Sequence, residues 1–111
     1  MYTPRWLADH PGPHHTLGDP SMPAHSRRHH FAAGNRHNAW DLLRAISAPT
    51  LVIHGTEDLL NPTANAPLLA DRILGARLHL ICEARHAYFE EFRTHASPLV
   101  LDFLTTAPHQ P

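Results

Sequence analysis

The chain has 111 residues, which is enough for one small domain, and its single Cys82 excludes an internal disulfide. Nine arginines and no lysine stand against ten acidic residues, so a formal net charge of −1 argues against nucleic-acid and membrane-surface partners. No apolar stretch is long enough to cross a bilayer, and the N-terminus lacks the apolar run of a signal peptide; we therefore expect a cytoplasmic protein.

The first half of the chain is poor in strand signals. Residues 1–23 are rich in proline and histidine, and we expect an irregular segment with at most one short turn of helix near Trp6. Residues 24–46 have a helical pattern that is interrupted near Gly34. Trp40 and Leu43 fall on one face of the second part, and Pro49 ends the pattern.

The second half alternates strand and helix. Residues 50–54 (TLVIH) and 77–82 (RLHLIC) are short apolar runs typical of buried strands. Residues 63–73 form a helix between them, with Pro67 in the first turn and Gly75 in a left-handed C-cap. A last helix follows Ser97 and Pro98 and ends near Thr105.

Strand, helix and strand with short connections predict a right-handed crossover with parallel strands. Both strands then end at the same edge of the sheet, which is where α/β proteins bind their ligands. The loop after the first strand carries Asp58 and the loop after the second carries His86. An acid beside a histidine can serve as the orienting group and the base of a nucleophilic triad.

Residues 46–58 (ISAPTLVIHGTED) resemble the penultimate core strand and acid loop of the α/β-hydrolase superfamily. The following helix, the last strand and a closing helix over 92–104 are similar too, so the resemblance covers about residues 40–106. The resemblance implies an α/β fold, in which residues 47–106 form the C-terminal strand-helix-strand-helix part of an α/β-hydrolase. A cap-like helical segment at 24–46 and the Pro/His-rich segment at 1–23 precede it, and 107–111 form a tail.

The resemblance also implies a chemistry, hydrolysis of an ester or related bond of a small-molecule substrate without a metal or organic cofactor. Asp58 and His86 match the acid and the histidine of a Ser-His-Asp triad. The G-x-S-x-G nucleophile motif is absent, because none of the serines lies in that context: Ser21, Ser26, Ser47 and Ser97. We therefore expect a C-terminal fragment of a hydrolase that is inactive in isolation.

Several residues of these loops allow a second interpretation. Asp58 could be a turn or helix-capping carboxylate and His86 an exposed loop histidine, while Glu57 fits a surface position. Cys82 could replace the nucleophile, although a cysteine that ends an apolar strand is usually buried. Tyr88 and Phe89 suit either a substrate pocket or the core. Where the family usually has glycine before its histidine, this chain has Ala84 and Arg85, and Arg85 could redirect the loop.

The alternative function is a non-catalytic fragment that acts by binding a partner or a metal. His10 with His14, and His25 with His29, have the four-residue spacing that places two imidazoles on one helical face. A zinc site normally needs three or four ligands, and no cysteine accompanies these pairs. Two strands alone leave open edges, so we also expect a marginally stable monomer that self-associates through them.

Overall fold

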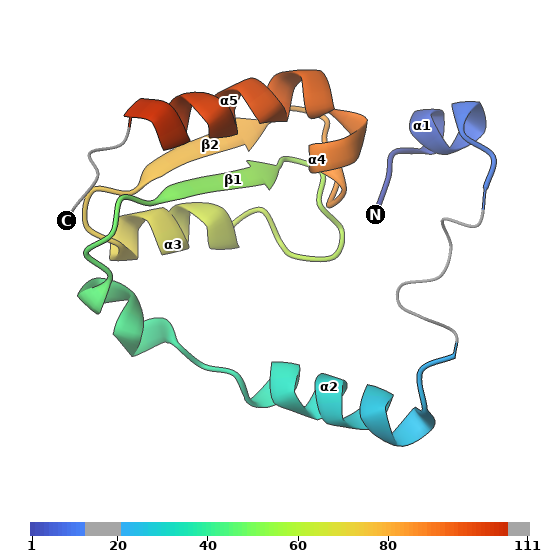
Figure 1. The fold of residues 1–111 in the computed structure, drawn as a ribbon, viewed down its shortest axis with the longest axis horizontal. Helices are drawn as coiled ribbons and strands as arrows, with labels where there is room; N and C mark the ends of the chain where they lie inside the picture. The colour runs from blue at the N-terminus through green and yellow to red at the C-terminus, as the bar shows by residue number, and fades with distance from the viewer. Residues whose placement is uncertain (13–20, 107–111) are drawn as a thin grey trace.

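The computed structural model describes residues 1–12 and 21–106, so the predicted tail at 107–111 lies outside the described residues (Figure 1). The elements are, in chain order, α1 (Pro4–Asp9), α2 (Ala24–Arg36), the 3-10 helix η1 (Trp40–Ala45), β1 (Leu51–Gly55), α3 (Asn65–Arg72), β2 (Arg77–Ile81), α4 (Tyr88–Glu91) and α5 (Arg93–Thr106).

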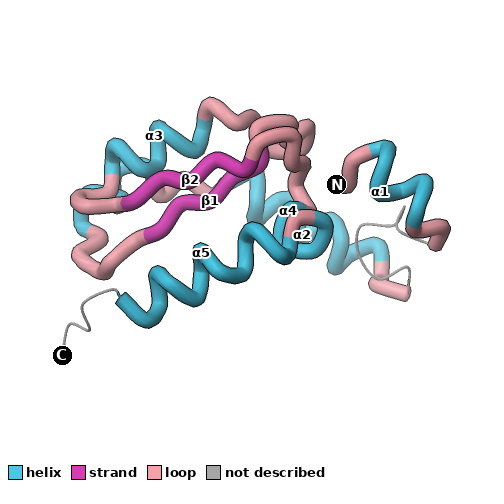
Figure 2. The backbone as a smooth tube through the Cα atoms, turned by 90° about the horizontal axis from the view of Figure 1, so that it is seen from above, coloured by secondary structure: helices cyan, strands magenta, loops and turns pink. Residues whose placement is uncertain are grey.

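The second half of the chain forms the predicted α/β unit. β1 and β2 are parallel, and their register pairs Leu51 with Arg77 and Gly55 with Ile81. Both views show α3 and α5 on opposite sides of the two strands (Figures 1 and 2). The parallel topology is confirmed, with strand bounds within one residue of those expected. Within the described residues the sheet has no third strand.

The turn between α3 and β2 depends on a glycine. The backbone N–H of Ala76 donates to the carbonyl oxygen of Ile73 at 3.1 Å, which closes a tight turn around Leu74 and Gly75. Gly75 has φ +74°, a conformation that glycine adopts without the steric cost of a side chain. The left-handed conformation is as predicted, although Gly75 lies in this turn rather than directly at the helix end at Arg72.

The hydrophobic core is built mainly from small side chains. Ile81, Ala84 and Ala96 form its buried cluster, and Ile53 and Tyr88 pack against them. Among the described residues no large side chain is fully buried, and many leucines remain exposed. A core of this size excludes little apolar surface from water, so a single substitution in it is expected to matter.

The last helix begins earlier than the sequence predicted. α5 begins at Arg93 and continues through Pro98, which we expected to precede it. Proline in a helix removes one backbone hydrogen bond, a local cost that this helix of 14 residues accommodates. The resemblance-based expectation of a closing helix over 92–104 is closer to the structure.

The first half shows two smaller differences. α2 continues through Gly34 to Arg36, so the break falls two residues later than expected, and none of its residues is buried. The segment after it is a 3-10 helix in which Leu42 is exposed. The Arg72 guanidinium lies over the Trp40 ring, with its Cζ 4.6 Å from the ring centroid. Asp41 binds the same guanidinium at 3.0 Å.

The N-terminal segment contains more helix than expected, because α1 spans six residues around Trp6. Thr3 caps the helix, because its hydroxyl oxygen accepts a hydrogen bond from the backbone N–H of Trp6 at 3.2 Å. Pro4 occupies the first turn, where its missing N–H removes no hydrogen bond of the helix. No helix in the described ranges is long and apolar enough to cross a membrane.

Gly55 offers a direct test of this packing. A Cβ at this position would collide with the carbonyl oxygen of Ala84 and lie 2.7 Å from that of Arg85. We predict that Gly55→Ala lowers the free energy of unfolding by about 1–3 kcal/mol or more, because backbone must move to admit the methyl group. Chemical denaturation followed by circular dichroism measures this change.

Gly34→Ala is the matched control. Apart from the backbone of its own helix and its chain neighbours, nothing in the described part of the chain lies within 4 Å of a Cβ there, and alanine in a helix is favoured over glycine by roughly 0.5–1 kcal/mol. Equal stabilities of Gly55→Ala and the unsubstituted chain would contradict the close approach of the two loops.

Candidate active site

The two loops that follow β1 and β2 are joined by backbone hydrogen bonds. The N–H of Thr56 donates to the carbonyl oxygen of Ile81 at 3.0 Å, and the N–H of Glu57 donates to that of Ala84 at 2.9 Å. In the opposite direction, the N–H of Glu83 donates to the Thr56 hydroxyl at 2.9 Å. These contacts fix the relative positions of the residues that follow in each loop.

Asp58 is the buried polar residue of this edge, with its side chain only 2% exposed. Its Oδ1 accepts hydrogen bonds from the backbone N–H groups of Leu60 at 2.7 Å and Asn61 at 3.0 Å. The carboxylate therefore closes its own loop, as an Asx turn does, and its second oxygen remains directed at other partners.

The structure brings the two predicted site residues together. His86 Nδ1 lies 2.8 Å from Asp58 Oδ2, although 28 positions separate the residues in the sequence. Gly55 at the end of β1 makes the approach possible, because a side chain there would collide with the loop that leads to His86. Asp58 also closes its own turn, as the alternative interpretation expected, because Oδ1 accepts the two loop N–H groups while Oδ2 faces His86.

The environment favours the ionised form of Asp58. Burial by itself would raise the pKa of this carboxyl group, but hydrogen bonds from the Asn61 N–H, the His86 ring and the Leu60 N–H outweigh it. The net result is a pKa below the ordinary value. Asp58 is therefore a carboxylate at neutral pH and can only accept hydrogen bonds.

The charge of Asp58 determines which nitrogen of His86 carries the proton. A carboxylate acceptor requires N–H at Nδ1, so neutral His86 has its lone pair at Nε2. No described residue makes a hydrogen bond to Nε2, and the side chain is 31% exposed. This imidazole can accept a proton at Nε2 from a group beside it.

A second histidine contacts the same carboxylate. His54, on β1, has its Nε2 3.6 Å from Asp58 Oδ2 and is 15% exposed. The sequence analysis treated it only as a strand residue. The available signal is its position four residues before Asp58, but the inward direction of its side chain depends on the strand register.

The residues after His86 serve the core and the surface. Tyr88 packs against the core cluster and donates a hydrogen bond to the carbonyl oxygen of Ile53 at 3.3 Å. Burial, and then the charge of Asp58, raise the pKa of its hydroxyl group. Phe89 is exposed, as is Glu57, and Cys82 is exposed rather than buried as expected.

The N-terminal residues cover the loop that carries His86. The N–H of Ala87 donates to the carbonyl oxygen of Met1 at 3.0 Å, and Arg85 Nη1 donates to that of Tyr2 at 3.3 Å. Thr3 binds the Glu91 carboxylate through its hydroxyl and its N–H. Arg85, which could have redirected the His86 loop, extends to this N-terminal segment.

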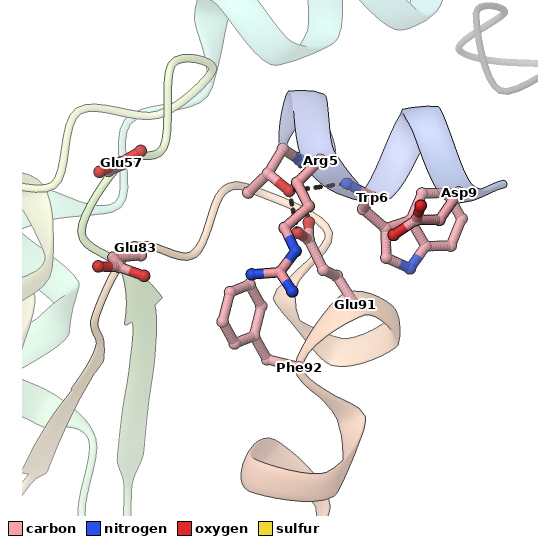
Figure 3. Close-up of a pocket in the computed structure, with 8 residues that line it drawn as sticks. Arg5, Trp6, Asp9, Glu57, Glu83, Glu91 and Phe92 are labelled. Atoms are coloured by element: carbon pink, nitrogen blue, oxygen red, sulfur yellow. Dashed lines mark hydrogen bonds between the residues drawn. The ribbon is translucent and has the colours of Figure 1, made fainter.

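A cavity of about 440 Å³ lies between α1 and the two loops (Figure 3). Its acidic side chains include Glu57 and Glu83 from the loops, and Arg5 extends toward Glu91 and Phe92. Trp6 also lines it, but Tyr2 and His10 stack on this ring with centroid distances of 4.2 and 4.1 Å. Neither Asp58 nor His86 lines this cavity.

The histidine pairs do not gather into a metal site in the described part of the chain. No group of three or more His, Cys, Asp or Glu side chains there could hold a metal ion. His25 and His29 lie exposed on α2, whereas His14, the proposed companion of His10, lies outside the described residues.

Known proteins similar to this chain are hydrolases. Serine hydrolase BPHL of Mus musculus is 40% identical over 63 residues, which are 57% of this chain and 22% of that protein. A hydrolase from Pseudomonas aeruginosa PA01 matches with a TM-score of 0.73 and 27% identity, over 93% of this chain and 40% of that chain. MGS-M2, an alpha/beta hydrolase enzyme from a Medee basin deep-sea metagenome library, matches with a TM-score of 0.62 and 29% identity, over 68% of this chain and 27% of that chain.

Over part of its length, this chain is related to the α/β-hydrolase superfamily. It has a partial α/β-hydrolase fold, with parallel strands and flanking helices, as the sequence analysis predicted. The chain spans about a quarter of the length of the curated relatives it matches. No protein-family profile matches it.

The lowered pKa of Asp58 predicts an acid-sensitive fold. The charged carboxylate stabilises the folded chain above its ordinary pKa of about 3.9, and this contribution is lost as pH falls through the lower folded-state value. We expect Asp58→Asn to reduce the free energy of unfolding at neutral pH by about 1–3 kcal/mol and to flatten its decline at acidic pH.

Denaturant titrations at several pH values measure both effects. Asp41→Asn is the control, because this exposed carboxylate pairs with Arg72 at the surface, and a change within about 0.5 kcal/mol is expected. If the free energy of unfolding of Asp58→Asn fell as steeply at acidic pH as that of the unsubstituted chain, the stabilising role of the ionised Asp58 carboxylate would be contradicted.

Proposed function

We propose that Asp58 and His86 are the acid and the base of a nucleophile–histidine–acid triad in a hydrolase. We also propose that the nucleophile belongs to a part of the enzyme outside these 111 residues. The observation that carries this proposal is the 2.8 Å contact between His86 Nδ1 and a buried, ionised Asp58, which leaves Nε2 as the basic nitrogen.

In this proposal His86 moves protons and Asp58 stabilises the charge that results. Nε2 accepts the proton of the attacking hydroxyl group as its oxygen bonds to the carbonyl carbon of an ester or related substrate. The imidazolium then donates this proton to the leaving group, and His86 next activates water to release the acyl group. Asp58 holds the ring in the required tautomer and stabilises its positive charge at each step.

The isolated chain is expected to lack this turnover. We predict that it hydrolyses a p-nitrophenyl ester no faster than its His86→Ala variant does, because both lack an activated nucleophile. An ester hydrolysis rate that His86→Ala abolishes, with identical purification of both proteins, would overturn the proposed location of the nucleophile.

A completed enzyme tests the proposed residues themselves. When the chain is joined to a preceding segment that carries a G-x-S-x-G motif, His86→Ala is expected to lower kcat by about 10³-fold or more, and Asp58→Asn by a comparable factor. His79→Ala is the matched control, because His79 contacts His95 rather than Asp58. Unchanged kcat in His86→Ala would contradict the triad.

A second function, binding of another protein chain, is favoured by the unfinished sheet. β1 pairs only with β2 among the described elements, and an open groove of about 410 Å³ runs beside it. The residues of this β1–α5 groove are mostly apolar: Leu51, Val52, Ile53, Tyr88, Val100 and Phe103. We propose that a second copy of this chain covers it, since open apolar strand edges pair readily with other chains.

Sedimentation velocity over a wide range of concentrations tests this association. We expect the unsubstituted chain to form larger species as concentration rises, and Val100→Lys to shift the population toward monomer. Leu42→Lys is the control, because Leu42 is exposed on η1 and does not line the groove. A chain that stays monomeric and melts cooperatively from dilute solution would contradict the proposal.

A further inference from the structure

Two imidazoles approach one oxygen of the buried carboxylate. Asp58 Oδ2 lies 2.8 Å from His86 Nδ1 and 3.6 Å from His54 Nε2. Asp58 Oδ1 is occupied separately by two backbone N–H groups. Both histidines therefore draw on the negative charge at Oδ2, but they reach it from different elements and through different ring nitrogens.

The other nitrogen of His54 identifies where its proton lies. His54 Nδ1 is 2.9 Å from the carbonyl oxygen of Gly55, and a carbonyl oxygen can only accept a hydrogen bond. Nδ1 must therefore carry the hydrogen. In neutral His54 the lone pair of Nε2 then faces the Asp58 carboxylate, whereas in charged His54 an N–H faces it. The contact with Asp58 is favourable only for the charged ring.

Few other charged side chains surround His54 and Asp58. The strand register places Leu80 opposite His54, and the first six residues of α3 are uncharged. The two charged residues of α3 are at its far end, where Arg72 binds Asp41.

On the loops and α4, His86 contacts Asp58 directly, and the Tyr88 hydroxyl group is exposed to the charge of Asp58. Burial and Asp58 keep the pKa of the Tyr88 hydroxyl high, so that group is neutral. Glu57, next to Asp58 in the sequence, is exposed. Among these groups, only Asp58 carries a buried negative charge that could attract a proton to His54.

We propose that His54 is a positioning residue. When protonated at Nε2, its ring holds a proton in addition to the one on His86 and competes with His86 for the charge of Asp58. When His54 is charged, its Nε2–H binds Oδ2 and less of the carboxylate charge stabilises an imidazolium at His86. When His54 is neutral, Asp58 supports His86 fully. This inference rests on the function proposed for Asp58 and His86, and it makes the strength of that pair depend on pH.

The test follows the imidazole rings of the full chain by ¹⁵N NMR across a pH titration. In the unsubstituted chain we expect neutral His54 to be the Nδ1–H tautomer, and the His86 curve to show a second inflection where His54 titrates. In His54→Asn, whose amide keeps a donor near Gly55 without a titrating ring, we expect the second inflection of the His86 curve to disappear.

His79→Asn is the matched control, since it removes an imidazole from β2 that contacts His95 instead of Asp58, and the second inflection of the His86 curve should remain. A neutral His54 with its proton on Nε2, or independent His54 and His86 curves, would overturn the proposal even if His54→Asn did not fold. Because no turnover is measured, this result is separate from that of His86→Ala in the completed enzyme.

Discussion

The buried carboxylate of Asp58 is the interaction on which this edge of the molecule depends. One oxygen fixes the loop after β1 through the N–H groups of Leu60 and Asn61, and the other binds His86 in the loop after β2. A buried charge without such partners would be strongly unfavourable. The arrangement that stabilises the charge is therefore also the one that orients the imidazole.

The parallel strands and the meeting of Asp58 with His86 could be predicted from sequence, because short apolar runs and one crossover determine the topology. His54 was missed, since the direction of a strand side chain depends on the final register with β2. The pattern alone placed the start of the last helix after Pro98, because proline favours a helix start locally, whereas the resemblance placed it at residue 92, close to the observed start at Arg93.

The contacts of the N-terminus could not be predicted, because they join residues more than 80 positions apart. Thr3 and Tyr2 bind the carboxylates of Glu91 and Glu90, so the first residues hold α4 and with it the loop of His86. The small core and the open edge of β1 leave the α/β unit incomplete as a sheet. This incomplete sheet agrees with a chain that spans about a quarter of the length of its curated relatives.

We propose that Asp58 and His86 form two parts of a triad whose nucleophile lies outside these residues. Sequencing the DNA directly upstream of the Met1 codon tests it most directly. We expect a reading frame with a G-x-S-x-G motif, joined in frame or through one frameshift. An upstream region without such a frame would contradict it.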